Sequence, residues 1–244
     1  MVLGCKRRSM QRYKQYCPVA RASEILADRW TPLIVRELIA GCRHFNEIER
    51  GLPGISRSLL ASRLRQLENA GVLDRLPGTR PNSTEYRLSE AGRDLKTVIE
   101  ALGAWGVRWA FGDPRPEELD AGVLVWKIHQ RINLELLPDR RTIVEFDFTG
   151  PHGRRVWLLL EPTEVSVCVT PPGFDSDLLV RANLALFYRV WLGHIDFGAA
   201  IRRRDVLVEG VPSLVKQFPK WLMWSPMARF VREHAKSVTS ARAT

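Results

Sequence analysis

The chain has 244 residues, enough for one large domain or two ordinary domains that each bury a core. Its 45% hydrophobic and 26% charged residues are typical of globular proteins, and no apolar run reaches the roughly 18 residues of a membrane span. Of the net charge of +10, most lies in residues 1–112, with 19 Lys and Arg against 11 Asp and Glu, whereas residues 113–244 have 18 against 16. The first half is therefore the candidate for binding phosphates, although a basic domain can also be merely soluble.

The cysteines and the basic N-terminus indicate a cytoplasmic protein. Cys5, Cys17, Cys42 and Cys168 form no C-x-x-C pair and no zinc-type spacing with histidine, so we expect no metal, no other cofactor and no disulfide framework. Residues 1–16 are basic but are not followed by the apolar core of a signal peptide. A reducing cytoplasm is the simplest setting for such a chain.

Four helices are expected before residue 72. Pro18 suits the first turn of one helix, and Thr31 with the following proline suits the N-cap and first turn of a second. A short helix over 45–52 ends at a Pro-Gly turn, and Ser56 caps a fourth helix that a glycine closes at residue 71.

A β-hairpin and a long helix follow. Strands are predicted at 72–78 and 84–89 around a polar turn, which gives a hairpin with a basic tip. The helix over 89–111 repeats apolar residues at helical spacing, namely Leu95, Val98, Ile99, Leu102, Trp105 and Trp109. The Pro-rich, acidic run that begins at 113 is the candidate linker. We therefore expect one domain over 1–112 and another over 119–244.

The second half has the pattern of an α+β domain. An amphipathic helix is expected over 124–136, and three β-rich runs separated by turns predict a meander. These runs are 142–148, 155–161 and 163–170. Further strands are expected at 178–183 and 205–210, with helices at 184–193 and 196–201 and a last helix at 212–223. One antiparallel sheet covered by helices accounts for this order.

The helix that begins at Ser56 has two contrasting faces. Leu60, Leu64 and Leu67 share one face, and the opposite face carries Arg57, Ser58, Ala61, Ser62 and Arg65. A helix that enters a DNA major groove needs this division, because short residues allow close approach and arginine reaches guanine edges or phosphates. An ordinary amphipathic surface helix would show the same pattern.

The hairpin after this helix strengthens the DNA-binding interpretation. Arg75 and Arg80 lie on it, where a wing can contact phosphate or the minor groove. The alternative is a solvated hairpin whose arginines only keep a strand edge soluble.

Residues 17–106 resemble the HxlR-type family of bacterial winged-helix regulators. The features that carry the resemblance are Cys17-Pro18, Asp28-Arg29-Trp30, RELIAG, Arg43-His44-Phe45, Gly54-Ile55-Ser56, LLASRLRQLENAGVLDR, and Glu85 to Ser89 with Ala91-Gly92. The resemblance implies a winged helix-turn-helix repressor that binds a palindromic operator as a homodimer, pairing through its terminal helices. It assigns DNA recognition to Ser56, Arg57, Ser58, Ser62 and Arg65. The glycine-containing wing tip, Pro77 to Ser83, departs from the family pattern.

Cys17 is a candidate redox sensor, because some members of the family sense oxidants or electrophiles through a cysteine at this position. The positive end of a helix dipole after Cys17 would favour the thiolate. The alternative is a small buried hydrophobic residue, the usual environment of a free cysteine.

The C-terminal half is similar to the sterol carrier protein domain, an α+β fold with an apolar tunnel for lipids. The similarity rests on Gly193, Asp196, Ala200 and a strand ending at Glu209-Gly210, within 186–222. It implies a small hydrophobic ligand, and the candidate pocket walls include Phe187, Trp191, Trp221 and Leu222. These residues could equally be simple core, and the domain could serve dimer contacts instead.

The expected function is a DNA-binding transcriptional repressor, gated by a hydrophobic ligand. An enzyme is not expected, because the five histidines are scattered and no nucleophile elbow, phosphate loop or metal-binding helix pattern is present. The alternative is a lipid- or acyl-binding carrier whose basic N-terminal domain serves interaction. Salt-dependent binding to one preferred palindrome would separate the two.

Overall fold

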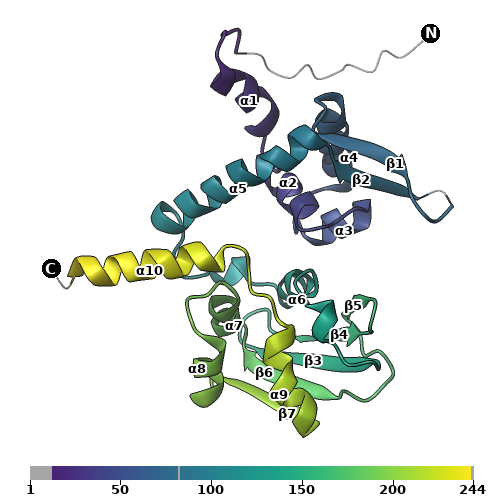
Figure 1. The fold of residues 1–244 in the computed structure, drawn as a ribbon, viewed down its shortest axis with the longest axis vertical. Helices are drawn as coiled ribbons and strands as arrows, with labels where there is room; N and C mark the ends of the chain where they lie inside the picture. Colours follow the sequence, from purple (N-terminus) through teal and green to yellow (C-terminus); the bar gives the residue numbers. More distant parts are fainter. Residues whose placement is uncertain (1–12, 82, 243–244) are drawn as a thin grey trace. The chain divides into compact units, whose positions relative to one another are not determined.

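The computed structural model describes residues 13–81 and 83–242 and contains two compact units, Met1–Ile99 and Glu100–Thr244 (Figure 1). We call them the N-terminal and the C-terminal unit. The division falls inside a helix, whereas the sequence suggests a boundary in the Pro-rich run that begins at 113. Residues 1–12 of the expected first domain, Cys5 among them, lie outside the described residues.

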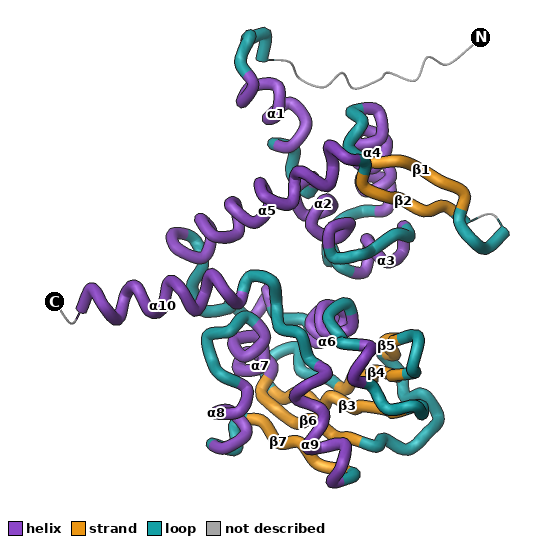
Figure 2. The backbone as a smooth tube through the Cα atoms, in the orientation of Figure 1, coloured by secondary structure: helices purple, strands orange, loops and turns teal. Residues whose placement is uncertain are grey.

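The N-terminal unit has the expected order of four helices, a hairpin and a long helix. Its elements are α1 (Pro18–Leu26), α2 (Thr31–Ile39), α3 (Phe45–Arg50), α4 (Arg57–Asn69), β1 (Leu73–Pro77), β2 (Thr84–Leu88) and the start of α5 (Glu90–Trp109). Helices α2, α3 and α4 pack around a small apolar core that includes Ile34, Ile48 and Leu60, all without exposed surface. The hairpin projects beyond these helices as two antiparallel strands (Figure 2).

The structure tests the two predicted N-cap residues, Ser56 and Thr31. Ser56 caps α4 as predicted, because its side chain accepts a hydrogen bond from the Leu59 N–H at 3.3 Å. The prediction that Thr31 caps α2 is wrong. Trp30 is the N-cap, with a left-handed φ of 80°, and its carbonyl accepts the hydrogen bond of Ile34 at 2.8 Å. Thr31 is already helical and is buried.

A close backbone approach sets the direction in which α5 leaves the hairpin. A Cβ atom on Gly92 would lie 2.0 Å from the carbonyl oxygen of Val72, so only glycine fits there. Ser89 secures the same corner, because its hydroxyl donates to the Gly71 carbonyl at 2.6 Å and accepts from the Gly92 N–H at 3.1 Å. The first turn of α5 is therefore fixed against the end of the α4–β1 connection.

The C-terminal unit contains a five-stranded sheet in the order β5-β4-β3-β6-β7. The strands are β3 (Thr142–Thr149), β4 (Arg155–Leu160), β5 (Val165–Cys168), β6 (Leu178–Asn183) and β7 (Val206–Gly210). The helices are α6 (Ala121–His129), α7 (Leu184–Trp191), α8 (Phe197–Arg202), α9 (Pro212–Trp221) and α10 (Ala228–Arg242), with short 3-10 turns η1 (Pro116–Glu118) and η2 (Leu134–Leu136). The fold class of the chain is α+β.

Three expectations for this unit are corrected. The meander β3-β4-β5 is present, but the sheet is not wholly antiparallel, because β6 pairs parallel to β3 after residues 169–177 carry the chain back across the sheet. The amphipathic helix expected over 124–136 is instead α6, which starts earlier and is largely buried, followed by the separate turn η2. The last helix expected at 212–223 is followed by another, α10, which was not predicted.

The two faces of this sheet differ in chemistry. On one face Val144, Phe146 and Phe148 are buried in a core that also takes residues from α6, α7, α8 and α9. On the other face Asp147 lies between Arg155 at 3.7 Å and Arg181 at 3.4 Å, as part of a row of ion pairs across the strands. Alternation along β3 therefore places the three apolar side chains under the helices and the ion pairs on the opposite face, where Trp157 is also buried. Within the described residues, no helix combines the length and the apolar character needed to cross a bilayer.

Replacing Gly92 by alanine tests the corner between the hairpin and α5. The added Cβ meets the Val72 carbonyl, so we expect Gly92→Ala to lower the free energy of unfolding by about 1–3 kcal/mol. The matched control is Gly106→Ala in the same helix, where nothing beyond the helix's own neighbouring backbone lies within 4 Å of the new Cβ and alanine should be neutral or stabilising by up to about 1 kcal/mol. Urea unfolding followed by circular dichroism measures both, and a Gly92→Ala protein as stable as wild type would contradict the assignment.

Candidate nucleic-acid interface

Helix α4 is docked on the N-terminal unit by the face that the sequence predicts. Leu60, Leu64 and Leu67 are each at most 1% exposed. The opposite face presents Arg57, Ser58 and Arg65 to solvent, and Ser62 is half-buried. An apolar underside and a polar, arginine-containing outer side are the arrangement that a DNA-reading helix requires.

The turn before α4 supports a helix-turn-helix. Gly54 has a φ of 87°, a conformation that favours glycine, and the buried Ile55 anchors the turn beneath the two helices. The Ile55 N–H donates to the Leu52 carbonyl at 3.2 Å, which tightens the connection between α3 and α4. This short turn fixes where α4 begins relative to α3.

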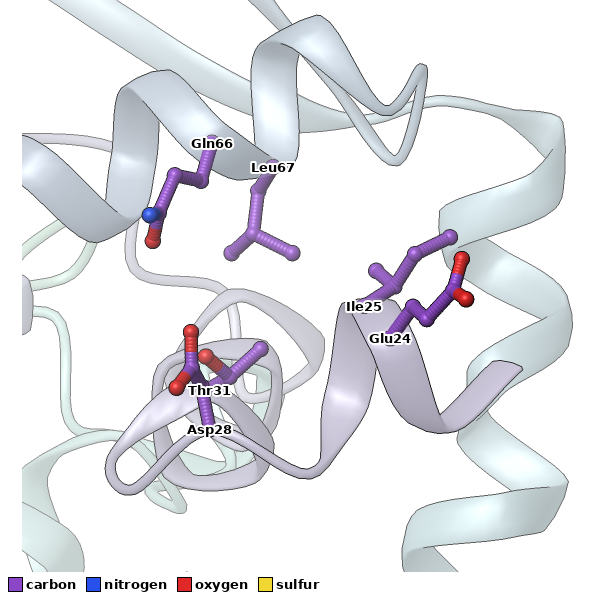
Figure 3. Close-up of a pocket in the computed structure, with 6 residues that line it drawn as sticks. All are labelled: Glu24, Ile25, Asp28, Thr31, Gln66 and Leu67. Carbon is purple, nitrogen blue, oxygen red and sulfur yellow. The ribbon is translucent and has the colours of Figure 1, made fainter. Parts of the chain in front are cut away.

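A polar anchor, formed by Arg63, holds the middle of α4 against the connection between α1 and α2. Arg63 forms an ion pair with Asp28, in the connection between α1 and α2, and donates to Gln66 at 2.7 Å. Beside this anchor is a small crevice of about 10 Å³, bordered by residues of α1, α2 and α4 (Figure 3). That volume is about what one water molecule needs, so the crevice is a packing gap and not a ligand site.

Arg57, at the first turn of α4, is held by the preceding helix. Its guanidinium forms an ion pair with Glu49, donates to the Asn46 side chain at 3.2 Å and lies over the Phe45 ring at 4.8 Å. These partners were not anticipated from the sequence, because nothing in the spacing of α3 and α4 indicates which side chains meet across the turn. A contact between Arg57 and DNA therefore has to compete with Glu49.

Ser58 and Arg65 present different groups on the same face. The Ser58 hydroxyl lies 3.3 Å from that of Ser56, so both surround the N-terminus of α4. Arg65 is exposed about two turns beyond Ser58, and its guanidinium has no ion-pair or hydrogen-bond partner within the described part of the chain. Its five N–H donors are available for an external acceptor.

The hairpin places the two predicted wing arginines in solvent. Arg75 lies on β1 opposite Tyr86, and Arg80 lies in the turn, where Ser83 donates to the Arg80 carbonyl at 2.7 Å. Asn82, in the same turn, lies outside the described residues. All seven residues expected to contact DNA therefore belong to α4, its N-cap or the hairpin, within one unit.

Cys17 stands at the N-cap position of α1 and is half-buried. Its backbone carbonyl accepts from the Arg21 N–H at 3.0 Å, but its side chain makes no capping hydrogen bond. The redox-sensor role of Cys17 stays a prediction.

The four candidate ligand-pocket residues lie in the core of the C-terminal unit. Phe187 and Trp221 have no exposed surface, and Trp191 and Leu222 are 6% and 7% exposed. Phe187 meets the ring of Phe146 edge-on with centroids 6.0 Å apart. In this arrangement the four side chains act as core residues, and their role toward a ligand stays a prediction.

Comparisons with known proteins concern the first half of the chain. The family model described as HxlR-like helix-turn-helix matches residues 25–113. An HTH-type transcriptional regulator of Mycobacterium tuberculosis (strain ATCC 25618 / H37Rv) is 48% identical over 100 residues, which are 41% of this chain and 61% of that protein. The match therefore spans less than two thirds of this relative.

Two smaller proteins from Bacillus subtilis are matched over most of their length. The HTH-type transcriptional regulator YvaP (strain 168) is 38% identical over 98 residues, which are 39% of this chain and 90% of YvaP. The solved structure of the reduced form of the transcriptional regulator YodB is 31% identical and covers 39% of this chain and 96% of its own, with a TM-score of 0.35.

Substitutions on α4 test the recognition face. On a duplex selected by the wild-type protein, we expect Arg65→Ala to weaken binding by about 5- to 150-fold in a gel-shift titration, because a contact to a base edge or phosphate is lost. Glu49→Gln should strengthen binding, since it removes the carboxylate that competes for Arg57. Arg202→Ala, which removes an exposed arginine at the end of α8, is the control and should bind like wild type. Equal affinities for the Arg65→Ala and Arg202→Ala proteins would contradict the assignment.

Proposed function

Because this chain belongs to the HxlR-like helix-turn-helix family, we propose that it is a transcriptional repressor that binds a palindromic DNA operator as a homodimer. The observation that carries the proposal is the outer face of α4, where Arg57, Ser58 and Arg65 are exposed while the leucines of the opposite face are buried. The basic excess of residues 1–112 adds long-range attraction to phosphates.

The long helix α5 supports a dimer. Val98, Leu102, Trp105 and Trp109 follow one another at helical spacing and are 48%, 53%, 59% and 65% exposed. A continuous row of large apolar side chains in solvent is uncommon on a monomer and marks an interaction surface. We assign its occupant as the same row on a second copy, because a twofold axis lets one surface patch pair with itself.

A homodimer accounts for a palindromic operator. Two copies of α4 related by a twofold axis read the same sequence on opposite strands, with half-sites about one helical turn, roughly 34 Å, apart. A protein bound across a promoter in this way blocks access of the transcription machinery, which is the repressor part of the proposal.

A second hypothesis concerns a hydrophobic effector bound by residues 119–244. It rests on the resemblance to the sterol carrier protein domain and on an aromatic core around Phe187 and Trp221. An apolar ligand would have to separate rings that are already packed, such as Phe218 and Trp221 at 5.9 Å. A native mass spectrum of the purified protein that shows a retained lipid would support the hypothesis, and one in which palmitate and cholesterol both fail to bind would remove it.

Selection from a random duplex library tests the DNA-binding function. We expect the full-length protein to enrich one palindrome, with an affinity for it at least about 10³-fold above that for unrelated DNA and falling steeply with salt concentration. Binding without sequence preference would contradict the proposed function, and no binding at physiological salt would remove it.

A charge placed in the row of exposed apolar side chains on α5 tests whether this row forms the dimer interface. Leu102→Glu puts a carboxylate in the row, so we expect a monomer in analytical ultracentrifugation and a loss of cooperative operator binding. The matched control is Thr97→Glu, which adds the same charge at an exposed position of the same helix, about 80–140° around its axis from the four row residues, and should stay dimeric. A Leu102→Glu protein that remains dimeric would show that α5 pairs by another face or not at all.

A further inference from the structure

The N-terminal unit contains an open groove of about 450 Å³ that is distinct from the α4 face. It lies between the end of α2 with the residues that follow it, the β2 strand and the first turns of α5. None of its lining residues belongs to α3, α4 or β1. Small-molecule sites in proteins typically measure about 300–1,000 Å³, so the groove is large enough for a compact organic molecule.

One part of the groove is apolar. Leu38 is buried at the end of α2, and Ile39 and Leu88 are half-buried beside it. Tyr86 adds a half-buried aromatic ring from β2. A hydrocarbon or aromatic body placed against these side chains would remove apolar surface from water on both sides, which favours binding by about 25 cal/mol per Å² buried.

The other part of the groove is strongly basic. Arg43, Arg87, Arg93 and Lys96 all line it. Arg87 is already neutralised, because it donates twice to the Glu85 carboxylate, at 2.7 and 3.0 Å, and this hydrogen bonding holds the pKa of Glu85 below its usual range.

The other three cations make no such paired contact with a carboxylate. One guanidinium nitrogen of Arg93 donates to the Leu88 carbonyl at 3.0 Å, and in the residues that the structure describes Arg43, Arg93 and Lys96 form no ion pair. Arg43 lies near enough to Glu85 to help lower the pKa of that carboxyl, so the uncompensated positive charge at the apolar surface comes from Arg93 and Lys96.

We propose that this groove binds a small organic anion, with a carboxylate held by Arg93 and Lys96 and an apolar body against Leu38, Ile39 and Leu88. Arginine and lysine form strong charge-assisted hydrogen bonds to a carboxylate. DNA phosphate would use the charges but not the apolar surface, and the lining elements are separate from α4. The combination therefore favours a small amphipathic anion over the DNA backbone.

The position of the groove gives such a ligand a route to regulation. Arg93 and Lys96 lie in the first two turns of α5, just after Gly92, whereas Leu38 and Ile39 belong to α2. A bound anion would join the two helices at the corner that sets the direction of α5. This regulatory part rests on the proposed function, whereas binding of the anion does not.

Fluorine NMR titration with trifluoromethyl-substituted benzoate tests the site directly on the full-length protein. We expect saturable binding of the benzoate, and about tenfold or greater weakening in the Arg93→Ala/Lys96→Ala double variant, since two charge-assisted contacts are lost. The corresponding benzamide, which has the same shape without the charge, should bind at least about tenfold more weakly to wild type. Arg65→Ala is the matched control, because it removes a cation outside the groove and should leave benzoate binding unchanged. Circular dichroism checks that the variants are folded.

Three results would overturn the inference. The first is an absence of saturable benzoate binding, and the second is benzoate binding that the double variant does not weaken. The third is a double variant that loses affinity for the selected duplex as strongly as Arg65→Ala and with a smaller salt dependence, which would make the groove a DNA contact. Failure of the wild-type protein to select any duplex would instead remove the proposed function and leave the benzoate result standing.

Discussion

Burial of Leu60, Leu64 and Leu67 fixes the rotation of α4 about its own axis, and the rest of the recognition surface depends on that rotation. Each buried leucine contributes about 1.5–3 kcal/mol, whereas an exposed ion pair such as that of Arg57 with Glu49 contributes at most about 1 kcal/mol. The leucines therefore decide where the helix sits. Arg57 can exchange Glu49 for an external partner while the backbone of α4 stays in place.

Features that depend on local pattern could be predicted from the sequence, and those that depend on contacts across the fold could not. The leucine face of α4, its Ser56 cap and the hairpin follow from periodicity and capping chemistry. The parallel pairing of β3 with β6 depends on where residues 169–177 return the chain, which no local pattern encodes. Helix α10 was missed because charged residues dominate its sequence, and the few residues of its apolar face, such as Ala228 and Val231, are small.

The same limit on prediction from the sequence applies to single side chains of the candidate site. The residues on the outer face of α4 could be chosen from helical spacing, but the partners of Arg57 on α3 could not. The groove bordered by Arg93 and Lys96 could not be predicted from the sequence either, because it brings together residues from α2, β2 and α5 that are far apart along the chain. By contrast, Phe187 and Trp221 were candidate pocket residues from the resemblance to the sterol carrier protein domain, and they are core residues in the structure. An open groove is ready to receive a ligand, whereas a filled aromatic core must first expand.

The corner at Gly92 makes α5 a lever arm. Its 20 residues span about 30 Å, with the hairpin corner at one end and the exposed tryptophans toward the other. A tilt of about 10° at the corner moves the far end of such a helix by about 5 Å, close to one helical turn. If the tryptophan end is held by a second copy of the chain, the same tilt instead rotates the hairpin and α4 about the corner. A single backbone contact, between Gly92 and the Val72 carbonyl, therefore sets the angle at which the two copies of a dimer would present α4.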